Sequence, residues 1–149
     1  MQIREMTAAD AAQMAAIEKT LFTDPWSEQG FLETLDRPEA HFIVLTETDG
    51  AVAGFCGAYC SAPEAEIVNV AVRQDMQGRG LGRQLVESLI ARLRSLDCTD
   101  IILEVRKSNA PARALYTRCG FEILGERKHF YQNPDESAII MQKLEEIHA

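Results

Sequence analysis

The 149-residue sequence has no long hydrophobic run and no apolar stretch at its start. Its most apolar segment, residues 51–62, is rich in glycine and alanine and is too short to cross a membrane, which takes about 20 predominantly apolar residues. The first residues, from Met1 to Glu5, lack the apolar core that is typical of a signal peptide. These absences predict a soluble, cytoplasmic protein.

Cysteine and positive charge are also scarce. The four cysteines, Cys56, Cys60, Cys98 and Cys119, form no Cys-x-x-Cys pair and have no histidine at the spacing of a metal site. We therefore expect no metal ion and interpret the cysteines as small, buried apolar residues. With 15 basic against 23 acidic side chains, the formal net charge is −8, which opposes binding to nucleic acid and suits a cationic partner.

The hydrophobic pattern predicts an α/β (α+β) fold in one domain over residues 1–149, since no linker, repeat or low-complexity tract interrupts the chain. Strands are expected near residues 3–6, 41–45, 51–59, 66–72, 101–105, 121–128 and 138–143. Helices are expected after Thr7 or Asp10, after Ser27, from Gly82 to Leu96, and after Ser108 or Asn109. The result is a mixed, largely antiparallel sheet with helices on both faces.

One strand is expected to differ from the others. Residues 101–105 form a continuous apolar run that is reached through a helical crossover. Such a run favours a strand parallel to residues 66–72 and covered on both faces.

A glycine-rich loop joins the strand that ends near Val72 to the strongest helical pattern in the chain. Its residues are Gln77, Gly78, Arg79, Gly80, Leu81 and Gly82. Glycines let the backbone turn sharply, and the following helix offers free N–H groups and the positive end of its dipole, so the loop predicts an anion site for a pyrophosphate. The alternative is a glycine-rich turn that binds nothing.

Two other phosphate-binding patterns do not fit this loop. A P-loop requires Gly-Lys-Ser/Thr after the glycines, which the sequence lacks. A dinucleotide fingerprint requires a third glycine where the sequence has Arg83 or, in the other register, Leu85.

The pattern Gln-x-x-Gly-x-Gly resembles the signature loop of the GNAT N-acetyltransferase superfamily. Further segments are similar to the bacterial ribosomal-protein-alanine N-acetyltransferases (the RimI family). These segments are Asp24-Pro25-Trp26-Ser27, Asn69-Val70-Ala71-Val72, Leu103-Glu104-Val105-Arg106 with Ser108-Asn109, and Ala114-Leu115-Tyr116 leading to Gly120-Phe121. The resemblance runs over nearly the whole chain.

The resemblance implies a GNAT-like fold with a V-shaped split between two central parallel strands, in which acetyl-CoA binds as co-substrate. The pantetheine arm would lie in the split and pair with free strand edges. The residues that would contact acetyl-CoA are Val70, Ala71, Val72, Gln77, Gly78, Arg79, Gly80, Leu81, Gly82, Arg83 and Asn109. Asn109 has the alternative role of a helix cap.

Glu104 is the one carboxylate within the apolar run Ile-Ile-Leu-Glu-Val. Burial without a partner would cost several kcal/mol, so it either faces a wet cleft or is paired. One interpretation is a salt bridge to Arg106, two residues on and on the same side of the strand. The other is a general base that accepts the proton of an incoming amine. The resemblance implies the second role.

Tyr116 lies in the helix after that strand. A helical tyrosine is more often part of the core, but the resemblance places Tyr116 at the position of the family's general acid, beside the thiolate that leaves. Because a tyrosine of pKa about 10 would protonate a thiolate of pKa about 8.5 against a gradient of about 2 kcal/mol, we expect a hydrogen bond to the developing thiolate.

The resemblance implies a peptide acceptor, the basic N-terminus of a ribosomal protein that begins with alanine, with no direct contact to nucleic acid or membrane. Two alternatives remain, a small-molecule amine as acceptor and a module that binds acetyl-CoA without turnover. One difference from the family bears on the acceptor. Close relatives carry two tyrosines where this sequence has Phe130 and Tyr131, so one hydroxyl is absent. Trp26, at the helix start, is expected either to pack on that helix or to contact the substrate, and the segment from Phe22 to Phe31 is expected to form one wall of the acceptor entrance.

Overall fold

A seven-stranded sheet forms the centre of the computed structural model, which describes residues 1–145. The strands lie in the order β1-β2-β3-β4-β5-β7-β6, and only β4 and β5 are parallel. Their bounds are Gln2–Glu5 (β1), Ala40–Thr46 (β2), Val52–Ser61 (β3), Glu64–Val72 (β4), Asp100–Arg106 (β5), Glu122–Tyr131 (β6) and Glu136–Leu144 (β7). The predicted mixed, largely antiparallel sheet is confirmed.

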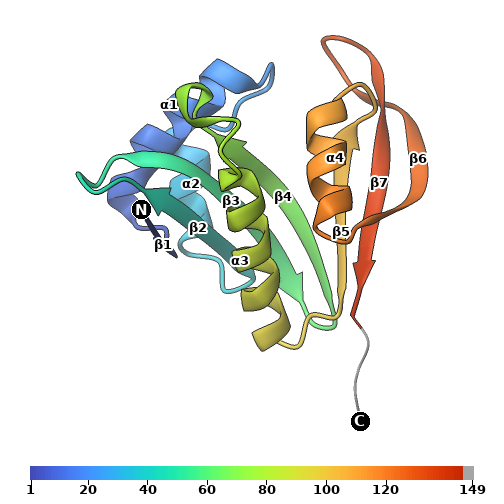
Figure 1. Ribbon diagram of the computed structural model, residues 1–149, viewed down its shortest axis with the longest axis horizontal. Helices are drawn as coiled ribbons and strands as arrows, with labels where there is room; N and C mark the ends of the chain where they lie inside the picture. Colours follow the sequence, from blue (N-terminus) through green and yellow to red (C-terminus); the bar gives the residue numbers. More distant parts are fainter. Residues whose placement is uncertain (146–149) are drawn as a thin grey trace.

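Helices cover both faces of this sheet (Figure 1). They are α1 (Ala11–Leu21), α2 (Glu28–Thr34), α3 (Leu81–Ser95) and α4 (Ala110–Arg118). In Figure 1, α1 and α2 lie behind β2, β3 and β4, whereas α3 lies in front of these strands and α4 in front of β5. The buried side chains form one cluster on each side, the first around Met14, Phe31 and Phe55 and the second around Leu89 and Leu103.

Local sequence signals account for several element ends. The Oγ of Ser27 accepts a hydrogen bond from the N–H of Gly30 at 3.0 Å, as expected of the residue that caps α2. The turn between β2 and β3 contains Gly50 with a φ of 88°, a conformation that glycine adopts without strain. Helix α3 begins at Leu81, one residue before the predicted start.

The prediction that residues 101–105 are covered on both faces is wrong. Burial alternates along β5: Ile101, Leu103 and Val105 are buried, whereas Ile102 and Glu104 are only partly covered. The reason is that Leu103 and Val105 pack in a cluster with Tyr116 of α4, whereas Figure 1 shows no helix over the opposite face of β5. The apolar run therefore does not mark a strand enclosed between two layers of helices.

The interpretation of the cysteines as small, buried apolar residues holds for two of them and is wrong for the other two. Cys60 at the end of β3 and Cys98 before β5 form a disulfide, whereas Cys56 and Cys119 are free and buried. The disulfide joins residues 38 apart in sequence, which come together because β3 pairs with β4 and β4 pairs with β5. Among residues 1–145, no helix is both long and apolar enough to span a membrane.

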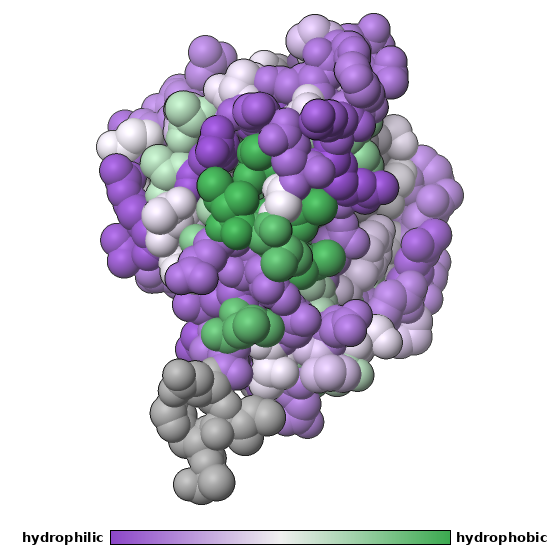
Figure 2. All heavy atoms as spheres, turned by 90° about the vertical axis from the view of Figure 1, so that its right-hand side faces the viewer, coloured by the Kyte–Doolittle hydropathy of each residue, from purple (hydrophilic) through white to green (hydrophobic). Residues whose placement is uncertain are grey.

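Strand β6 forms one edge of the sheet, and Figure 2 views the molecule from that side. Apolar side chains gather there within a largely polar surface. Large apolar residues exposed on β6 and β7 are Ile123, Leu124, Phe130 and Leu144. Charged residues such as Glu126 and Lys128 also lie along β6, and charges on an edge strand oppose pairing with another chain.

Candidate active site

The central feature of the site is the place where β4 and β5 part. Their parallel pairing covers only Glu64 to Ile67 on β4 and Asp100 to Leu103 on β5. Beyond these residues the two strands diverge (Figure 1). Since β4 remains paired with β3 and β5 with β7, each strand turns one free edge toward the gap, as predicted for the V-shaped split.

A bulge in β4 lies at the start of this gap. The pairing with β3 passes from Ile67 opposite Ala58 to Asn69 opposite Gly57, which leaves Val68 without a partner. An extra residue of this kind bends a strand and frees backbone groups from the ladder. The bulge thus helps to turn β4 away from β5.

A cavity of about 520 Å³ occupies this region. Its walls come from α1 and the following loop (Glu18, Leu21, Phe22, Thr23, Asp24, Trp26), from β4 (Ile67, Val68, Asn69, Val70), from β5 and the next turn (Leu103, Glu104, Val105, Arg106, Ser108), and from α4 and the β6–β7 hairpin (Asn109, Ala112, Tyr116, Tyr131, Pro134, Glu136). Of the predicted site residues, the cavity brings together Glu104, Tyr116, Val70 and Asn109.

The other predicted contacts lie in the glycine loop and at the end of β4, which do not line the cavity. In Figure 1, α3 begins at the wide end of the gap, where its first-turn N–H groups lack partners within the helix. Gly78 and Gly80, just before the helix, have φ values of 81° and 76°. The side chain of Gln77 donates to the carbonyl of Val72 at 3.0 Å and so holds the loop to the end of β4.

The remaining residues of this segment have individual roles. A Cβ on Gly82 would lie 3.3 Å from Cδ2 of Leu115, so glycine permits the close approach of α3 to α4. Arg79 is exposed, and Arg83 pairs with Glu87 at 2.8 Å. Ala71 is buried against the cluster of α1 and α2, so only its backbone can face the gap.

Glu104 is paired, but not with Arg106. Its Oε1 accepts a hydrogen bond from Nη1 of Arg127 at 2.7 Å, and its side chain is 15% exposed. Arg127 comes from β6 and also stacks on the ring of Phe130 at 4.6 Å. The predicted alternative of a Glu104–Arg106 salt bridge is therefore wrong, because the Arg106 guanidinium turns to the β6–β7 hairpin instead.

Tyr116 lies on the inner side of α4, where it is 8% exposed and its ring packs on Phe121 at 6.1 Å. It nevertheless lines the cavity. Burial raises the pKa of Tyr116 above its usual range, so the phenol remains protonated at neutral pH and available as a hydrogen-bond donor.

Asn109 caps α4, since its Oδ1 accepts from the N–H of Ala112 at 3.2 Å. Trp26 packs on Phe31 at 5.2 Å and on Phe42 at 5.6 Å, and it also lines the cavity. The predicted packing of Trp26 on α2 is therefore confirmed, whereas its place in an acceptor entrance stays a prediction.

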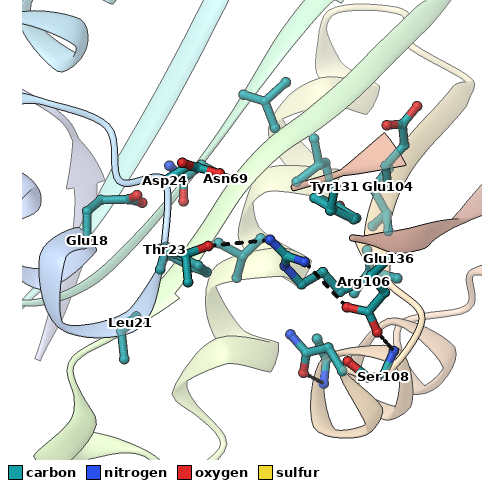
Figure 3. Close-up of a pocket in the computed structure, with 18 of the residues that line it drawn as sticks. Glu18, Leu21, Thr23, Asp24, Asn69, Glu104, Arg106, Ser108, Tyr131 and Glu136 are labelled. Carbon is teal, nitrogen blue, oxygen red and sulfur yellow. Dashed lines mark hydrogen bonds and ion pairs between the residues drawn. The ribbon is translucent and has the colours of Figure 1, made fainter. Parts of the chain in front are cut away.

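Glu18 is a site residue that the sequence analysis missed. Its side chain extends from α1 toward Asn69 (Figure 3) and is 1% exposed. Oε2 accepts the N–H of Trp26 at 3.2 Å, whereas Oε1 has no hydrogen-bond partner within residues 1–145. Burial raises the pKa of Glu18. The sequence feature that could have predicted its burial is its position four residues after Met14, on the apolar side of the helix.

The ionisable residues give the cavity a negative character. Four of its lining residues carry carboxylates, and the only lining arginine or lysine is Arg106. The carboxylates are Glu18, Asp24, Glu104 and Glu136. In residues 1–145, no cluster of three or more His, Cys, Asp or Glu side chains has the arrangement of a metal site. Two of these carboxylates have arginine partners, since Glu104 pairs with Arg127 and Glu136 with Arg106.

Comparison with known proteins identifies the relatives of this chain. The sequence profile described as the acetyltransferase (GNAT) family matches residues 11–121. The ribosomal protein bS18-alanine N-acetyltransferase of Escherichia coli (strain K12) is 37% identical over 141 residues, which is 93% of this chain and 94% of the relative. The N-alpha-acetyltransferase RimI of Mycobacterium tuberculosis is 32% identical over 147 residues, 95% of this chain and 90% of the relative.

Solved structures agree with these matches. The crystal structure of the ribosomal-protein-S18-alanine N-acetyltransferase from Escherichia coli gives a TM-score of 0.89 at 33% identity, covering 99% of this chain and 96% of that one. Ard1 from Thermoplasma volcanium gives a TM-score of 0.87 at 27% identity, covering 96% of both chains.

The buried carboxylate of Glu18 leads to a prediction about stability and pH. Because its pKa is raised on folding, the stability it provides is complete below the unfolded pKa of about 4.3 and is lost as the pH rises through the native pKa. Glu18→Gln removes this titration and keeps an acceptor for Trp26. We expect the Tm of the variant, relative to the parent, to increase between about pH 4 and pH 8.

Thermal melts across this pH range measure the effect. Glu33→Gln, at an exposed position of α2, controls for the loss of one negative charge. A Tm difference for Glu18→Gln that follows the control at every pH would contradict the prediction.

Proposed function

The chain belongs to the GNAT family of acetyltransferases, and on this basis we propose that it transfers the acetyl group of acetyl-CoA to the N-terminal alanine of a ribosomal protein. It spans almost the full length of relatives named for this reaction on ribosomal protein bS18. The observation that carries the proposal is the cavity between β4 and β5, which has both Glu104 and Tyr116 in its walls.

The donor is assigned to the side of the sheet that carries α3 and α4. The N–H groups of the Gly78–Gly82 loop and of the first turn of α3 bind the pyrophosphate, and the positive end of the helix dipole favours its charge. The side chains of Arg79 and Arg83 lie in the same segment and add positive charge. The pantetheine amides pair with the free edges of β4 and β5. Asn109 contributes at the start of α4.

Transfer then proceeds by direct attack. The amine nitrogen of the acceptor bonds to the thioester carbon, and the carbonyl oxygen takes the negative charge while a free N–H of β4 near residues 70–72 stabilises it. The intermediate collapses with cleavage of the carbon–sulfur bond, and CoA leaves as a thiolate. No covalent bond to the enzyme is formed.

Glu104 accepts the proton that the amine loses, directly or through one water. Arg127 contacts only Oε1, which leaves Oε2 for this task. Tyr116 donates a hydrogen bond to the sulfur as its charge grows. Because burial raises the pKa of Tyr116, full transfer of its proton is even less favourable than for a tyrosine in water, and the hydrogen bond is the stabilising interaction.

The acceptor is assigned from charge and pKa. A terminal α-amine with pKa about 8 is partly neutral at neutral pH, whereas lysine with pKa about 10.4 rarely is, so one carboxylate suffices as base for the former. The negative cavity and the net charge of −8 suit a peptide whose first residues are basic. A small cationic amine satisfies the same charges and is the second candidate.

One assay separates these candidates. The protein is incubated with acetyl-CoA and, in parallel, with basic peptides that begin with alanine, the same peptides with a blocked α-amine and an internal lysine, and a set of polyamines. Mass spectrometry should find the acetyl group on the alanyl α-amine. Acetylation of polyamines alone would assign the small-molecule activity, and binding of acetyl-CoA without any product would contradict both.

Glu104→Gln tests the base. The variant should fold and bind acetyl-CoA but lose about a hundred- to ten-thousand-fold in kcat/KM, with recovery at high pH, where the amine is already neutral. Glu64→Gln, at the exposed start of β4, is the control and should match the parent. If Glu104 serves only to pair with Arg127, then Arg127→Gln should lose as much activity, and neither loss should depend on pH.

Tyr116→Phe tests the donor of the hydrogen bond. The substitution retains the ring that packs on Phe121 and removes only the hydroxyl. We expect kcat to fall about ten- to a thousand-fold with little change in Tm, which is within the range for such groups. A variant with normal turnover would assign Tyr116 to the core alone.

Gly80→Val tests the donor loop. A side chain at this left-handed position displaces the loop, so the affinity for acetyl-CoA should fall about ten- to a hundred-fold, equivalent to one or two charge-assisted hydrogen bonds. Gly50→Val is a matched control, because Gly50 has the same backbone strain and open space but lies in the β2–β3 turn. Titration calorimetry of both variants is the measurement, and equal affinities would remove the loop from the site.

A further inference from the structure

The guanidinium of Arg106 lies at the centre of a network in the wall of the cavity (Figure 3). Nη2 donates to the carbonyl of Gln132 at 3.0 Å, and Nη1 donates to the carbonyl of Pro134 at 3.1 Å. The same group lies over the ring of Tyr131 at 4.4 Å. Three successive parts of the β6–β7 hairpin loop are thus held by one side chain.

The network also includes two other segments. Nη2 of Arg106 lies 3.4 Å from Oγ1 of Thr23, in the loop that joins α1 to α2. Nη1 lies 3.5 Å from Oε1 of Glu136, whose Oε2 accepts the N–H of Ser108 at 2.8 Å. Arg106 therefore connects the two loops on opposite walls of the cavity and fixes both to the end of β5.

The chemistry of arginine explains why this residue type occupies the position. Its planar guanidinium donates in several directions at once and stacks on an aromatic face, whereas a lysine offers a single ammonium. The side chain is 24% exposed, so these bonds form in a partly dehydrated place. The carbonyl groups of a loop are not paired by a helix or a sheet. Hydrogen bonds from a fixed cation therefore limit the conformations that the loop can adopt.

The position of Tyr131 gives the network its significance for the reaction. Tyr131 lines the cavity, and its pKa is raised by burial and by the nearby charge of Glu104. The ring that Arg106 supports is therefore close to the carboxylate to which the acceptor amine is assigned. A displaced hairpin loop would change the wall against which the acceptor lies.

We propose that Arg106 is a positioning residue for the acceptor: by holding the Tyr131–Glu136 loop and the Thr23 loop together, it shapes the binding site of the acceptor peptide without touching acetyl-CoA. This inference rests on the proposed transfer to a peptide α-amine. It gives Arg106 a role separate from that of Glu104, although the two lie two residues apart on the same face of β5.

The test compares Arg106→Met, Arg106→Lys and a matched control, Lys107→Met. Lys107 follows Arg106 at the end of β5, and its ammonium pairs with Glu126 of β6 at 3.2 Å, outside the hairpin loop. For Arg106→Met we expect KM for an alanyl peptide to rise about ten- to a hundred-fold, while kcat and the Kd of acetyl-CoA stay within about threefold. Arg106→Lys should fall between Arg106→Met and the parent, and the control should match the parent.

Hydrogen exchange of the same proteins provides an independent measurement. Arg106→Met should increase amide exchange in residues 22–26 and 131–136 and leave α3 unchanged. Normal KM with a lower Tm would overturn the proposal and leave Arg106 a purely structural residue, and so would a loss of acetyl-CoA affinity equal to the rise in KM. If the parent acetylates no peptide, the proposed function fails, and the exchange data still decide whether Arg106 holds the two loops.

Discussion

The site depends on a hydrogen-bond ladder that ends early. Four residues of β4 pair with four of β5, and the strands then part because each remains bound to its other neighbour. Unpaired backbone groups in the interior of a sheet need partners, which makes the gap a place for an extended ligand with amides of its own. The bulge at Val68 lies where the two strands begin to part, and α3 begins at the wide end of the gap.

The two sides of the sheet have different tasks in the proposed reaction. On the side of α3 and α4, backbone amides and the phenol of Tyr116 act on the donor, whose charge is negative. On the other side, carboxylates act on a cationic acceptor, and Arg106 and Arg127 hold the loops and carboxylates in place. The two arginines share one face of the β5–β7–β6 unit but serve different partners, since Arg127 binds Glu104 and Arg106 binds carbonyl oxygens.

Sequence reasoning selected several residues that line the cavity, but it did not find the partners that they contact. Glu104 stood out as a carboxylate in an apolar run, and the partner considered for it was Arg106, two residues along the same strand. The actual partner comes from β6, 23 residues away, because β6 reaches β5 only through β7 and with shifted register. Glu18 was overlooked because a helical glutamate usually faces solvent, and the residue it binds, Trp26, lies beyond the end of its helix.

The sequence by itself determined the features that depend on neighbours a few positions away. These include the apolar stripe of α3, the caps at Ser27 and Asn109, and the left-handed glycines before Leu81, since each is a property of three to five consecutive residues. The tertiary structure alone decided which carboxylate meets which arginine, that Cys60 meets Cys98, and where the ladder between β4 and β5 stops. Those outcomes depend on strand order and register, which are fixed by the packing of the whole sheet and not by any local pattern.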